Sequence, residues 1–382
     1  PQSNSPPTTT SAAADASSSD SAAGFSHWTD DPRLDPRLAK YCALSKDAVP
    51  PEIAIPEDYG ARRQLIKMVD QALRVGLTVH GGSQKVSTKG ITFAEEYITS
   101  FSYGADGPPE KLGKGEAYPD PIRVFKYIPE GPGPHPVVVW LHGGAMALLD
   151  PTLQTWRSIG YMLAGMGVLT IFPFFTNSVD APFPRGLHDC MSSVQWVFDN
   201  QVSLGASSQL VIAGDSGGAN LGLACALLAS KIGFDGIRGV FAMCPGIREK
   251  YPSEDCPSHR EFDGYVIQLA DNLAQVLLDM YITPVDEDGN PGVPMEPTSL
   301  MHVHLATPEE LRTLPPLVIS VNELDPLRDD GIPFARAAWR AGVSARLITR
   351  NGTTHGGDLN VGVVPDLARA TIADLAAFVK DS

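Results

Sequence analysis

The sequence of 382 residues is 43% hydrophobic and has 29 basic against 44 acidic side chains, a formal net charge of -15. The hydrophobic content is sufficient for a large globular core. The acidic balance argues against binding to nucleic acid or to an anionic membrane surface, and no apolar run is long enough to span a bilayer.

Residues 1–24 consist almost entirely of small and polar residues, and we expect them to form a disordered tail, because they cannot bury enough apolar surface to offset the entropy of ordering. Residues 25–110 are expected to form cap helices and a lead-in to the main domain. Within them, apolar side chains recur on one face between residues 61 and 75, which predicts an amphipathic helix packed on another element.

Short apolar segments and helical segments alternate along the rest of the chain. Apolar runs of this kind, without apolar–polar alternation, predict strands that are covered on both faces, and alternation with helices predicts a mostly parallel sheet. Strands are expected at 93–101, 122–128, 137–141, 167–174, from about 210, at 239–243, 317–321 and 345–349, and helices at 188–201, 217–231, 333–339 and 367–379.

The alternation breaks between residues 247 and 314. Apolar side chains at helical spacing predict a helix over 266–280, and a loop rich in proline and glycine is expected at 284–297. We expect a cap insertion at 248–314 to divide the main domain into two parts, 111–247 and 315–382. Together with the N-terminal helices it would cover the carboxyl edge of the sheet, where ligands of open α/β sheets bind.

One stretch has the pattern of a nucleophilic serine, Gly214-Asp215-Ser216-Gly217-Gly218. It stands between an expected strand and an expected helix, which is the context that the Gly-x-Ser-x-Gly arrangement requires. The turn there is so tight that the serine adopts strained backbone angles and its neighbours must be small. Its hydroxyl is then held above the sheet, close to a helix N-terminus.

A serine hydroxyl needs a base to take its proton and an acid to orient that base. Asp325 follows the expected strand 317–321 and His355 follows the strand 345–349, so both lie on the same edge of the sheet as Ser216. The order Ser, Asp, His is typical of this architecture. Glu323 is the rival acid, and Asp325 itself could be a turn residue.

Four other polar residues have simpler interpretations. Asp329 or Asp330 could cap the helix that follows Asp325. His302 and His304 alternate as on a strand and could share a metal, but no third ligand is placed, so they are interpreted as solvated loop residues and no metal site is predicted.

The segment His142-Gly143-Gly144-Ala145 directly follows a buried strand. Acyl transfer develops a negative oxygen that needs backbone donors about 3 Å away, and a glycine pair allows the backbone to come that close. Alone, the segment would be an ordinary strand-ending turn. Together with the serine motif it predicts an oxyanion loop, in which His142 braces the loop and is not a second base.

These motifs together resemble the hormone-sensitive-lipase-like branch (bacterial family IV type) of the α/β-hydrolase esterases, which includes many microbial carboxylesterases. The resemblance extends from about residue 136 to the C-terminus. It rests on His142–Ala145, Gly214–Leu221, Asp325–Asp330 and His355–Gly356. Pro182-Phe183-Pro184, followed by Asp189, is also similar to the segment that precedes the serine motif in this family.

The resemblance implies an α/β-hydrolase fold with a mostly parallel central sheet, helices on both faces and a helical cap. It also implies a catalytic triad and an oxyanion hole made of backbone N–H groups. The triad would be Ser216, His355 and Asp325, the oxyanion donors Gly144, Ala145 and Gly217, and the supporting residues His142, Gly143, Gly214, Asp215 and Gly218.

Two features depart from the family pattern. Ala145 stands where the family usually has a third glycine, which keeps the N–H but adds a methyl group that narrows the pocket. Residues 175–180 replace the usual Tyr-Arg-Leu-Ala-Pro-Glu segment, so specificity does not transfer from relatives.

The predicted function is that of a serine carboxylic-ester hydrolase, which acts through an acyl-enzyme on small to medium, mostly apolar esters and needs no metal or organic cofactor. One alternative is a ligand-binding protein on the same fold, as in the plant gibberellin receptors, which lack a working triad. Cleavage of amides, carbamates, lactones or thioesters is another.

The expected partner is a small-molecule ester, without nucleic acid and without a membrane span, and a homodimer stays open. Five scattered cysteines do not form a disulfide framework or a zinc motif, although one disulfide stays open. A cytoplasmic location is favoured over secretion, which stays open because the chain begins at Pro1.

Overall fold

A computed structural model describes residues 27–44, 54–80, 86–104, 113–269 and 272–382, so the tail expected at 1–24 lies outside the described residues. An eight-stranded sheet with the order β1-β4-β6-β5-β7-β8-β9-β10 forms its centre. Only β4 runs against the other strands, because it pairs antiparallel with both β1 and β6. The strands are β1 (Ile91–Ile98), β4 (Ile122–Pro129), β5 (His135–Leu141), β6 (Leu169–Pro173), β7 (Ala206–Asp215), β8 (Gly239–Met243), β9 (Leu317–Asn322) and β10 (Ala345–Arg350).

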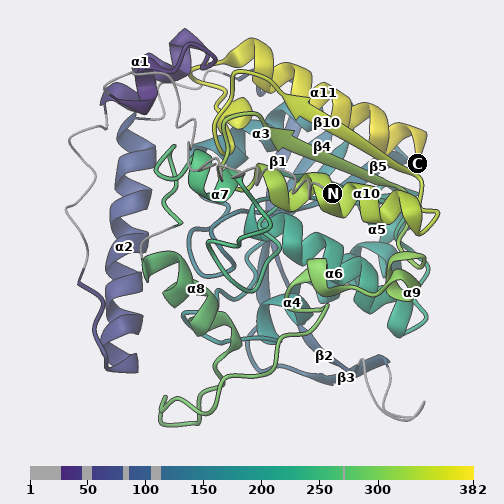
Figure 1. Ribbon diagram of the computed structural model, residues 1–382. Coiled ribbons are helices and arrows are strands. Elements are labelled where there is room, and N and C mark those ends of the chain that lie inside the picture. The colour runs from purple at the N-terminus through teal and green to yellow at the C-terminus, as the bar shows by residue number, and fades with distance from the viewer. Residues whose placement is uncertain (1–26, 45–53, 81–85, 105–112, 270–271) are drawn as a thin grey trace, which may run out of the picture.

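Helices cover both faces of this sheet (Figure 1). Successive side chains of β5 show the reason, since Val138 and Trp140 enter one buried cluster while Val137 and Val139 enter another. A strand buried on both sides has to be apolar throughout, and the prediction of a mostly parallel, doubly covered sheet is confirmed. One face is covered by α3 (Gln154–Gly165) and α11 (Pro365–Asp381), the other by α4 (Arg185–Asp199), α6 (Gly217–Lys231) and α10 (Arg328–Arg340).

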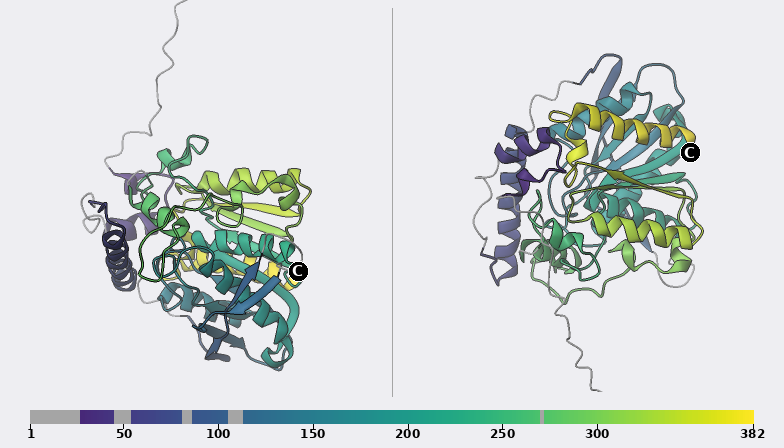
Figure 2. Two further views of the ribbon diagram at one scale, coloured as in Figure 1. Left: turned by 90° about the horizontal axis from the view of Figure 1, so that it is seen from below. Right: turned by 45° about the horizontal axis from the view of Figure 1, so that its top comes forward.

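Four further helices gather on one side of the molecule, as Figures 1 and 2 show. These are α1 (Pro36–Leu44), α2 (Tyr59–His80), α7 (Ser258–Glu261) and α8 (Asn272–Ile282). Ile66 of α2 and Met280 of α8 share a buried cluster with Ala147 and Leu148, which follow the end of β5. The helical cap therefore rests on the carboxyl ends of the strands, because that is where β5 ends.

Shorter elements complete the described structure. A separate two-stranded ribbon is made of β2 (Phe101–Gly104) and β3 (Gly113–Ala117). The remaining short helices are η1 (Trp28–Asp30), α5 (Gln201–Leu204), η4 (Val303–Leu305), α9 (Pro308–Leu311) and η5 (Gly357–Leu359).

The largest errors in the predicted boundaries concern one strand and two helices. The strand expected over 93–101 is two strands, since β1 ends at Ile98 and Phe101 begins the ribbon. The chain turns between them, where the buried hydroxyl of Ser100 donates to Asp189. The helix expected from 266 begins only at Asn272, because Val266 has φ 75° and its side chain is 51% exposed. The helical spacing of its apolar residues was coincidental there.

The helix expected over 333–339 begins five residues earlier, at Arg328. Proline is favoured in the first turn of a helix, because it lacks the N–H that an interior position uses. Here Pro333 lies inside α10. The carbonyl of Asp329, four residues before Pro333, instead accepts a hydrogen bond from the buried thiol of Cys256 at 3.4 Å.

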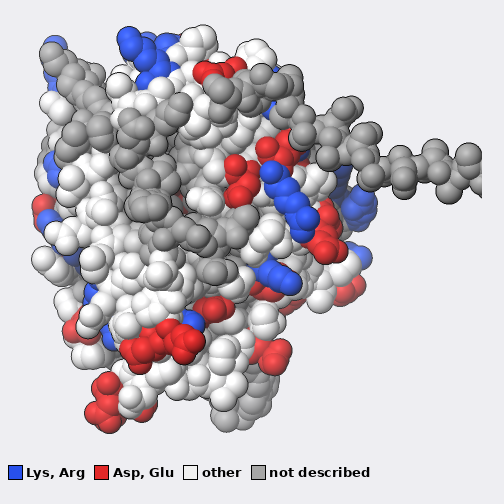
Figure 3. Space-filling model, turned by 60° about the vertical axis from the view of Figure 1, so that its left-hand side comes forward, with Lys and Arg blue, Asp and Glu red and all other residues white. Residues whose placement is uncertain are grey.

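The structure bears on whether the chain could span a membrane and whether it contains a disulfide. In the described part of the chain, no helix is both long and apolar enough to cross a membrane. On the face around α1 and α2, acidic and basic side chains lie interspersed among neutral residues (Figure 3). All five cysteines lie within the described residues, are buried and form no disulfide, so the disulfide that the sequence left open is not formed.

Candidate active site

Ser216 stands at the sharp turn between β7 and α6. Its backbone angles are φ 55° and ψ -122°, a strained conformation for a residue with a side chain. The flanking glycines are required by close contacts: a Cβ on Gly214 would lie 2.5 Å from the carbonyl oxygen of Gly218, and a Cβ on Gly218 would lie 2.1 Å from that of Leu141. The local sequence therefore folds as the predicted elbow, which exposes the Ser216 hydroxyl above the sheet.

A continuous chain of hydrogen bonds links the three residues that the sequence placed on this edge. The Oγ of Ser216 lies 3.0 Å from Nε2 of His355, and Nδ1 of His355 lies 2.9 Å from Oδ2 of Asp325. Asp325 is fully buried, and its other oxygen accepts the N–H of Leu327 at 2.8 Å. The backbone of the loop thus fixes the carboxylate, which in turn orients the imidazole.

The rival acids point elsewhere. Glu323 accepts the N–H of Gly352 at 2.8 Å and is not bonded to His355. Asp329 accepts the N–H of Ser258 and Asp330 that of Ile247, so both tie α10 to the segment after β8. The suggestion that they cap the helix is wrong, because Leu327 occupies the N-cap position.

The loop from His142 to Asp150, which we call the oxyanion loop, lies against the elbow. A Cβ on Gly143 would approach the Cβ of Ser216 to 3.3 Å, and one on Gly217 would lie 3.0 Å from the backbone nitrogen of Ala145. Within the described residues, the N–H groups of Gly144, Ala145 and Gly217 have no acceptor. Three N–H groups without an acceptor among these residues therefore belong to the elbow and to the loop that packs against it.

Asp215 anchors the start of this loop. Its Oδ2 accepts the N–H of Gly143 at 3.1 Å, and its Oδ1 accepts two indole N–H groups, from Trp140 at 2.9 Å and Trp156 at 3.1 Å. Burial raises the pKa of Asp215 to about 6, although the three donors stabilise its charged form. The two tryptophans were not identified from the sequence, because only the folded chain brings their N–H groups to one carboxylate.

His142 is buried at the base of the same loop. Its ring stacks on Phe175 with centroids 4.1 Å apart, and its Nδ1 is 2.8 Å from the carbonyl of Gly143. Burial lowers the pKa of His142 to about 4, so that the ring is neutral at neutral pH. These contacts are consistent with the prediction that His142 braces the loop. The histidine that is hydrogen-bonded to the Ser216 hydroxyl is His355.

The electrostatics at His355 favour its protonated form. Burial alone lowers the pKa of the imidazole, but the charge and hydrogen bond of Asp325, together with the carboxylates of Asp215 and Asp358, outweigh this effect. The pKa of His355 therefore lies above the ordinary value. This environment stabilises the imidazolium that forms when the ring accepts a proton.

Two groups of potential metal ligands occur among the described residues. One is Asp325 and His355 with the neighbouring thiol of Cys244, where the hydrogen bonds already engage both ring nitrogens. The other is Cys256, His259 and Asp330. There Nδ1 of His259 accepts the N–H of Ser253, so its Nε2 carries the proton and donates to Asp330, which leaves no lone pair for a cation.

The histidines at 302 and 304 do not form a metal pair in the way considered from the sequence. His302 is buried, with burial lowering its pKa to about 4, so the expectation of a solvated loop residue is wrong for it. His304 is partly buried, and its Nε2 lies 2.7 Å from Glu249. Both residues lie within the expected cap insertion, where the ring of His302 contacts that of Tyr281 and Nδ1 of His304 lies 2.9 Å from the carbonyl of Ile247.

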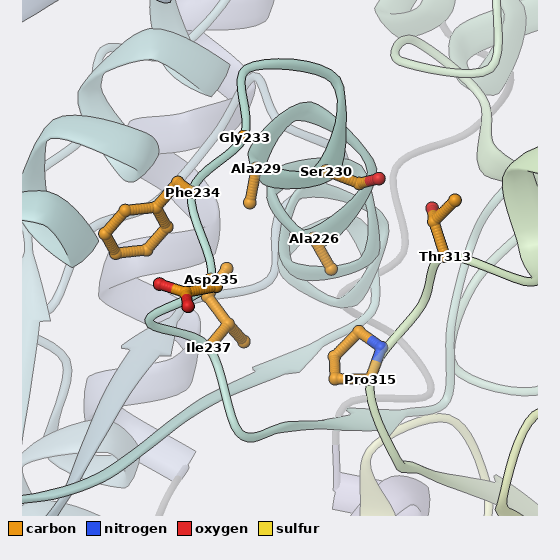
Figure 4. Close-up of a pocket in the computed structure, with 9 residues that line it drawn as sticks. All are labelled: Ala226, Ala229, Ser230, Gly233, Phe234, Asp235, Ile237, Thr313 and Pro315. Carbon is orange, nitrogen blue, oxygen red and sulfur yellow. The ribbon is translucent and has the colours of Figure 1, made fainter.

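A hollow of about 370 Å³ lies away from these residues, at the C-terminal end of α6. In Figure 4, Thr313 and Pro315 face the last turns of α6 across it. Ser216 precedes the opposite end of the same helix, so the hollow does not belong to the candidate active site. It is lined by Ala226, Ala229, Ser230, Gly233, Phe234, Asp235, Ile237, Thr313 and Pro315.

Known proteins share both the sequence pattern and the fold. Residues 138–358 match the model of a family described as having an alpha/beta hydrolase fold. The carboxylesterase NlhH of Mycobacterium tuberculosis is 31% identical over 264 residues, which cover 68% of this chain and 77% of NlhH.

Solved structures agree with this. The esterase Est22 is 31% identical, with a TM-score of 0.76 over 93% of this chain and 99% of Est22. Brefeldin A esterase, described as a bacterial homologue of human hormone-sensitive lipase, is 30% identical, with a TM-score of 0.77 over 92% of this chain and 94% of that one. The fold and the activity class that the motifs implied are thereby confirmed. The chain belongs to the α/β-hydrolase fold family and is a carboxylic-ester hydrolase of its hormone-sensitive-lipase-like branch.

Proposed function

We propose that Ser216, His355 and Asp325 are the catalytic triad of this ester hydrolase, and that the N–H groups of Gly144, Ala145 and Gly217 form its oxyanion hole. The observation that carries the proposal is the unbroken hydrogen-bond chain from the Ser216 hydroxyl to Asp325, beside three backbone donors without an acceptor among the described residues. His142, Gly143, Gly214, Asp215 and Gly218 support this geometry.

The reaction follows from these positions. The Oγ of Ser216 attacks the ester carbonyl carbon while its proton moves to Nε2 of His355, and the carbonyl oxygen, now negative, accepts hydrogen bonds from the oxyanion donors. When this intermediate collapses, the alcohol leaves with the proton from His355, and an acyl-enzyme remains. Water then loses a proton to His355 and attacks the acyl carbon, which releases the acid and restores the Ser216 hydroxyl. Asp325 stabilises the imidazolium in both steps.

We further propose that the substrates are small to medium, mostly apolar esters. The residues that cover the oxyanion loop support this, since Ile66, Val276 and Met280 of the cap are apolar and Ala145 packs against their cluster. A series of p-nitrophenyl esters from acetate to palmitate tests it, and kcat/KM should fall for the longest chains. The leaving group is suitable because a solved structure of the relative Est22 contains p-nitrophenol. A maximum at palmitate would contradict the size limit.

A cytoplasmic location is part of the proposal, and five cysteines that form no disulfide support a reducing compartment. The same machinery could cleave amides, carbamates, lactones or thioesters, because a triad determines the reaction type and not the leaving group. Comparing kcat/KM for matched ester and amide substrates decides between them, and the ester should be preferred.

The raised pKa of His355 predicts a specific pH dependence. The ring must be neutral to accept a proton from Ser216, so activity is lost as the pH falls through the pKa of His355. We therefore expect the apparent pKa of the acid limb in the pH profile of kcat/KM to lie above the ordinary imidazole value of about 6.5. Asp215→Asn removes a nearby negative charge and should move this limb to lower pH.

The pH profile is measured as kcat/KM with a substrate that does not itself titrate. The position of the limb is the readout, because a loss of amplitude would also follow from disturbing the oxyanion loop. A limb below the ordinary imidazole value, or one that stays in place in Asp215→Asn, would contradict the prediction.

Gly144 offers a direct test of the oxyanion loop. Its φ is 120°, and an added Cβ would lie 2.2 Å from the carbonyl oxygen of Leu148, so Gly144→Ala must displace the loop. We expect kcat to fall by about 100- to 1,000-fold, the usual loss when an oxyanion donor is misplaced. Ala145→Gly is the matched control, since glycine keeps the N–H and accepts the φ of 53° there. It should stay within a few-fold of the wild type, and equal losses in both variants would argue against the assignment.

A further inference from the structure

Backbone strain in the oxyanion loop is not confined to Gly143 and Gly144 but continues in the residues that follow them. Ala145, Met146 and Leu149 have φ angles of 53°, 59° and 71°, all in the left-handed region that disfavours residues with side chains. Such a conformation persists only where surrounding contacts hold it. The positions of the Gly144 and Ala145 donors therefore depend on what holds the loop at its two ends.

The core of the fold holds the first part of the loop. Gly143 is bonded to Asp215, which is next to the nucleophile. The carbonyl of Met146 accepts the N–H of Ser178 at 2.8 Å, and its sulfur lies 3.3 Å from Nδ2 of Asn220 in α6. Gly143 and Met146 are thus held by the end of β7, by α6 and by the loop that follows β6.

A helix outside the sheet holds the last part. Asp70 of α2 accepts the N–H of Leu149 on Oδ1 at 2.6 Å, and its Oδ2 accepts Nε of Arg74 at 2.7 Å. The guanidinium of Arg74 also pairs with Asp150, the next residue of the loop. The carbonyl of Leu149 accepts Nδ2 of Asn177 at 2.9 Å, so that side chains hold both backbone groups of the strained residue.

The same helix also packs on the loop through an apolar contact. Ile66, one turn before Asp70, is fully buried in a cluster with Ala147 and Leu148 of the loop. One face of α2 therefore makes a buried apolar contact and a polar contact with the same nine residues. By contrast, Lys67 on this helix pairs with Asp180 at 2.8 Å, outside the loop.

We infer that Asp70, supported by Arg74, is a positioning residue of the esterase, which acts through Leu149 on the oxyanion donors. The inference rests on the proposed oxyanion hole. Without the Asp70 carboxylate, the N–H of Leu149 loses its acceptor and the left-handed conformation loses its support, so the loop relaxes toward ordinary angles. The donors then move away from the developing oxyanion, while the contacts that bind the ground-state ester stay. The expected signature is a loss in kcat and not in KM.

The test compares Asp70→Ala, Asp70→Asn and the matched control Lys67→Ala in the full chain, with p-nitrophenyl acetate as substrate. We expect Asp70→Ala to lower kcat by about 10- to 100-fold, since a displacement of about 1 Å can have that effect, with KM changed by less than about 3-fold. Asp70→Asn keeps an oxygen for the Leu149 N–H and should retain more activity than Asp70→Ala. Lys67→Ala breaks a contact of the same helix and should stay within about 2-fold of the wild type.

Three outcomes would overturn the inference. Asp70→Ala could have the same kcat as Lys67→Ala, or its defect could appear in KM instead of kcat. The third is that all three variants lose the same activity and show the same shift in Tm. If Asp70→Ala does not fold, the split between kcat and KM in Asp70→Asn decides. Ser216→Ala distinguishes a failure of the proposed triad from a failure of the role of Asp70. Full activity in Ser216→Ala refutes the proposed triad, whereas an inactive Ser216→Ala beside a fully active Asp70→Ala refutes only the role of Asp70.

Discussion

Replacing Ser216 with alanine should abolish ester hydrolysis, with kcat lowered by about 10,000-fold or more. The hydroxyl is the only atom at the elbow that is bonded to His355, at 3.0 Å, and without it no acyl-enzyme can form. Removing a serine nucleophile from a working triad has an effect of this order, and the small remainder comes from the oxyanion donors and substrate binding. The measurement is kcat with p-nitrophenyl acetate, together with covalent labelling by a fluorophosphonate.

Ser193→Ala is the matched control for this experiment. Ser193 is also a buried serine, but its hydroxyl donates to the carbonyl of Asp189 within α4. The wild type and Ser193→Ala should both be labelled, and Ser216→Ala should not. Labelling that persists in Ser216→Ala would place the nucleophile elsewhere, and a wild-type protein that resists labelling would favour the non-catalytic, ligand-binding alternative.

The second large effect is expected for Asp325→Asn, which should lower kcat by about 1,000- to 10,000-fold. Asparagine has nearly the same shape, but its amide can present an N–H to Nδ1 of His355, which favours the tautomer that cannot accept the Ser216 proton. The change also removes the charge that raises the pKa of His355 and stabilises the imidazolium. A pre-steady-state burst of p-nitrophenol reports whether acylation is the step that slows.

Glu323→Gln tests the competing assignment of the acid. The Glu323 carboxylate accepts the N–H of Gly352, and the carbonyl of glutamine can replace it in that contact. The variant should therefore keep kcat within about 3-fold of the wild type. If Glu323→Gln lost more activity than Asp325→Asn, the acid of the triad would be misassigned.

Most of the sheet was predictable because its strands are covered on both faces. That burial requires apolar side chains at successive positions, as in Val137 to Leu141, and the pattern is visible without any partner. The bounds of α6 were also predicted correctly, because the serine motif at the elbow determines where this helix begins. The errors occurred where a distant contact decides, as at Ser100, which binds Asp189 and ends a strand, and at Pro333, which lies inside α10.

The candidate site divides in the same way. The order of Ser216, Asp325 and His355 after three strands could be read directly, because parallel strands bring their carboxyl ends to one edge. The choice between Asp325 and Glu323 rested on a weak local argument, and the hydrogen bonds now give each carboxylate a separate partner. The roles themselves are what the substitutions above test.

By itself, the sequence determined the fold, the family and the residues at the elbow, since these depend on local patterns of burial, backbone angles and spacing. Only the tertiary structure decided which side chains hold the oxyanion loop. These side chains come from four separate elements: Asp70 from the cap helix α2, Asp215 from the end of β7, Trp140 from the buried strand β5 and Trp156 from α3, which covers one face of the sheet. Nothing in the spacing of these residues links them, because a hydrogen bond between distant segments leaves no periodic signal in the chain. The loop that we propose binds the oxyanion is therefore recognisable from the local sequence, but its conformation is maintained by distant contacts, with the core of the fold at its start and with the cap helix α2 at its end.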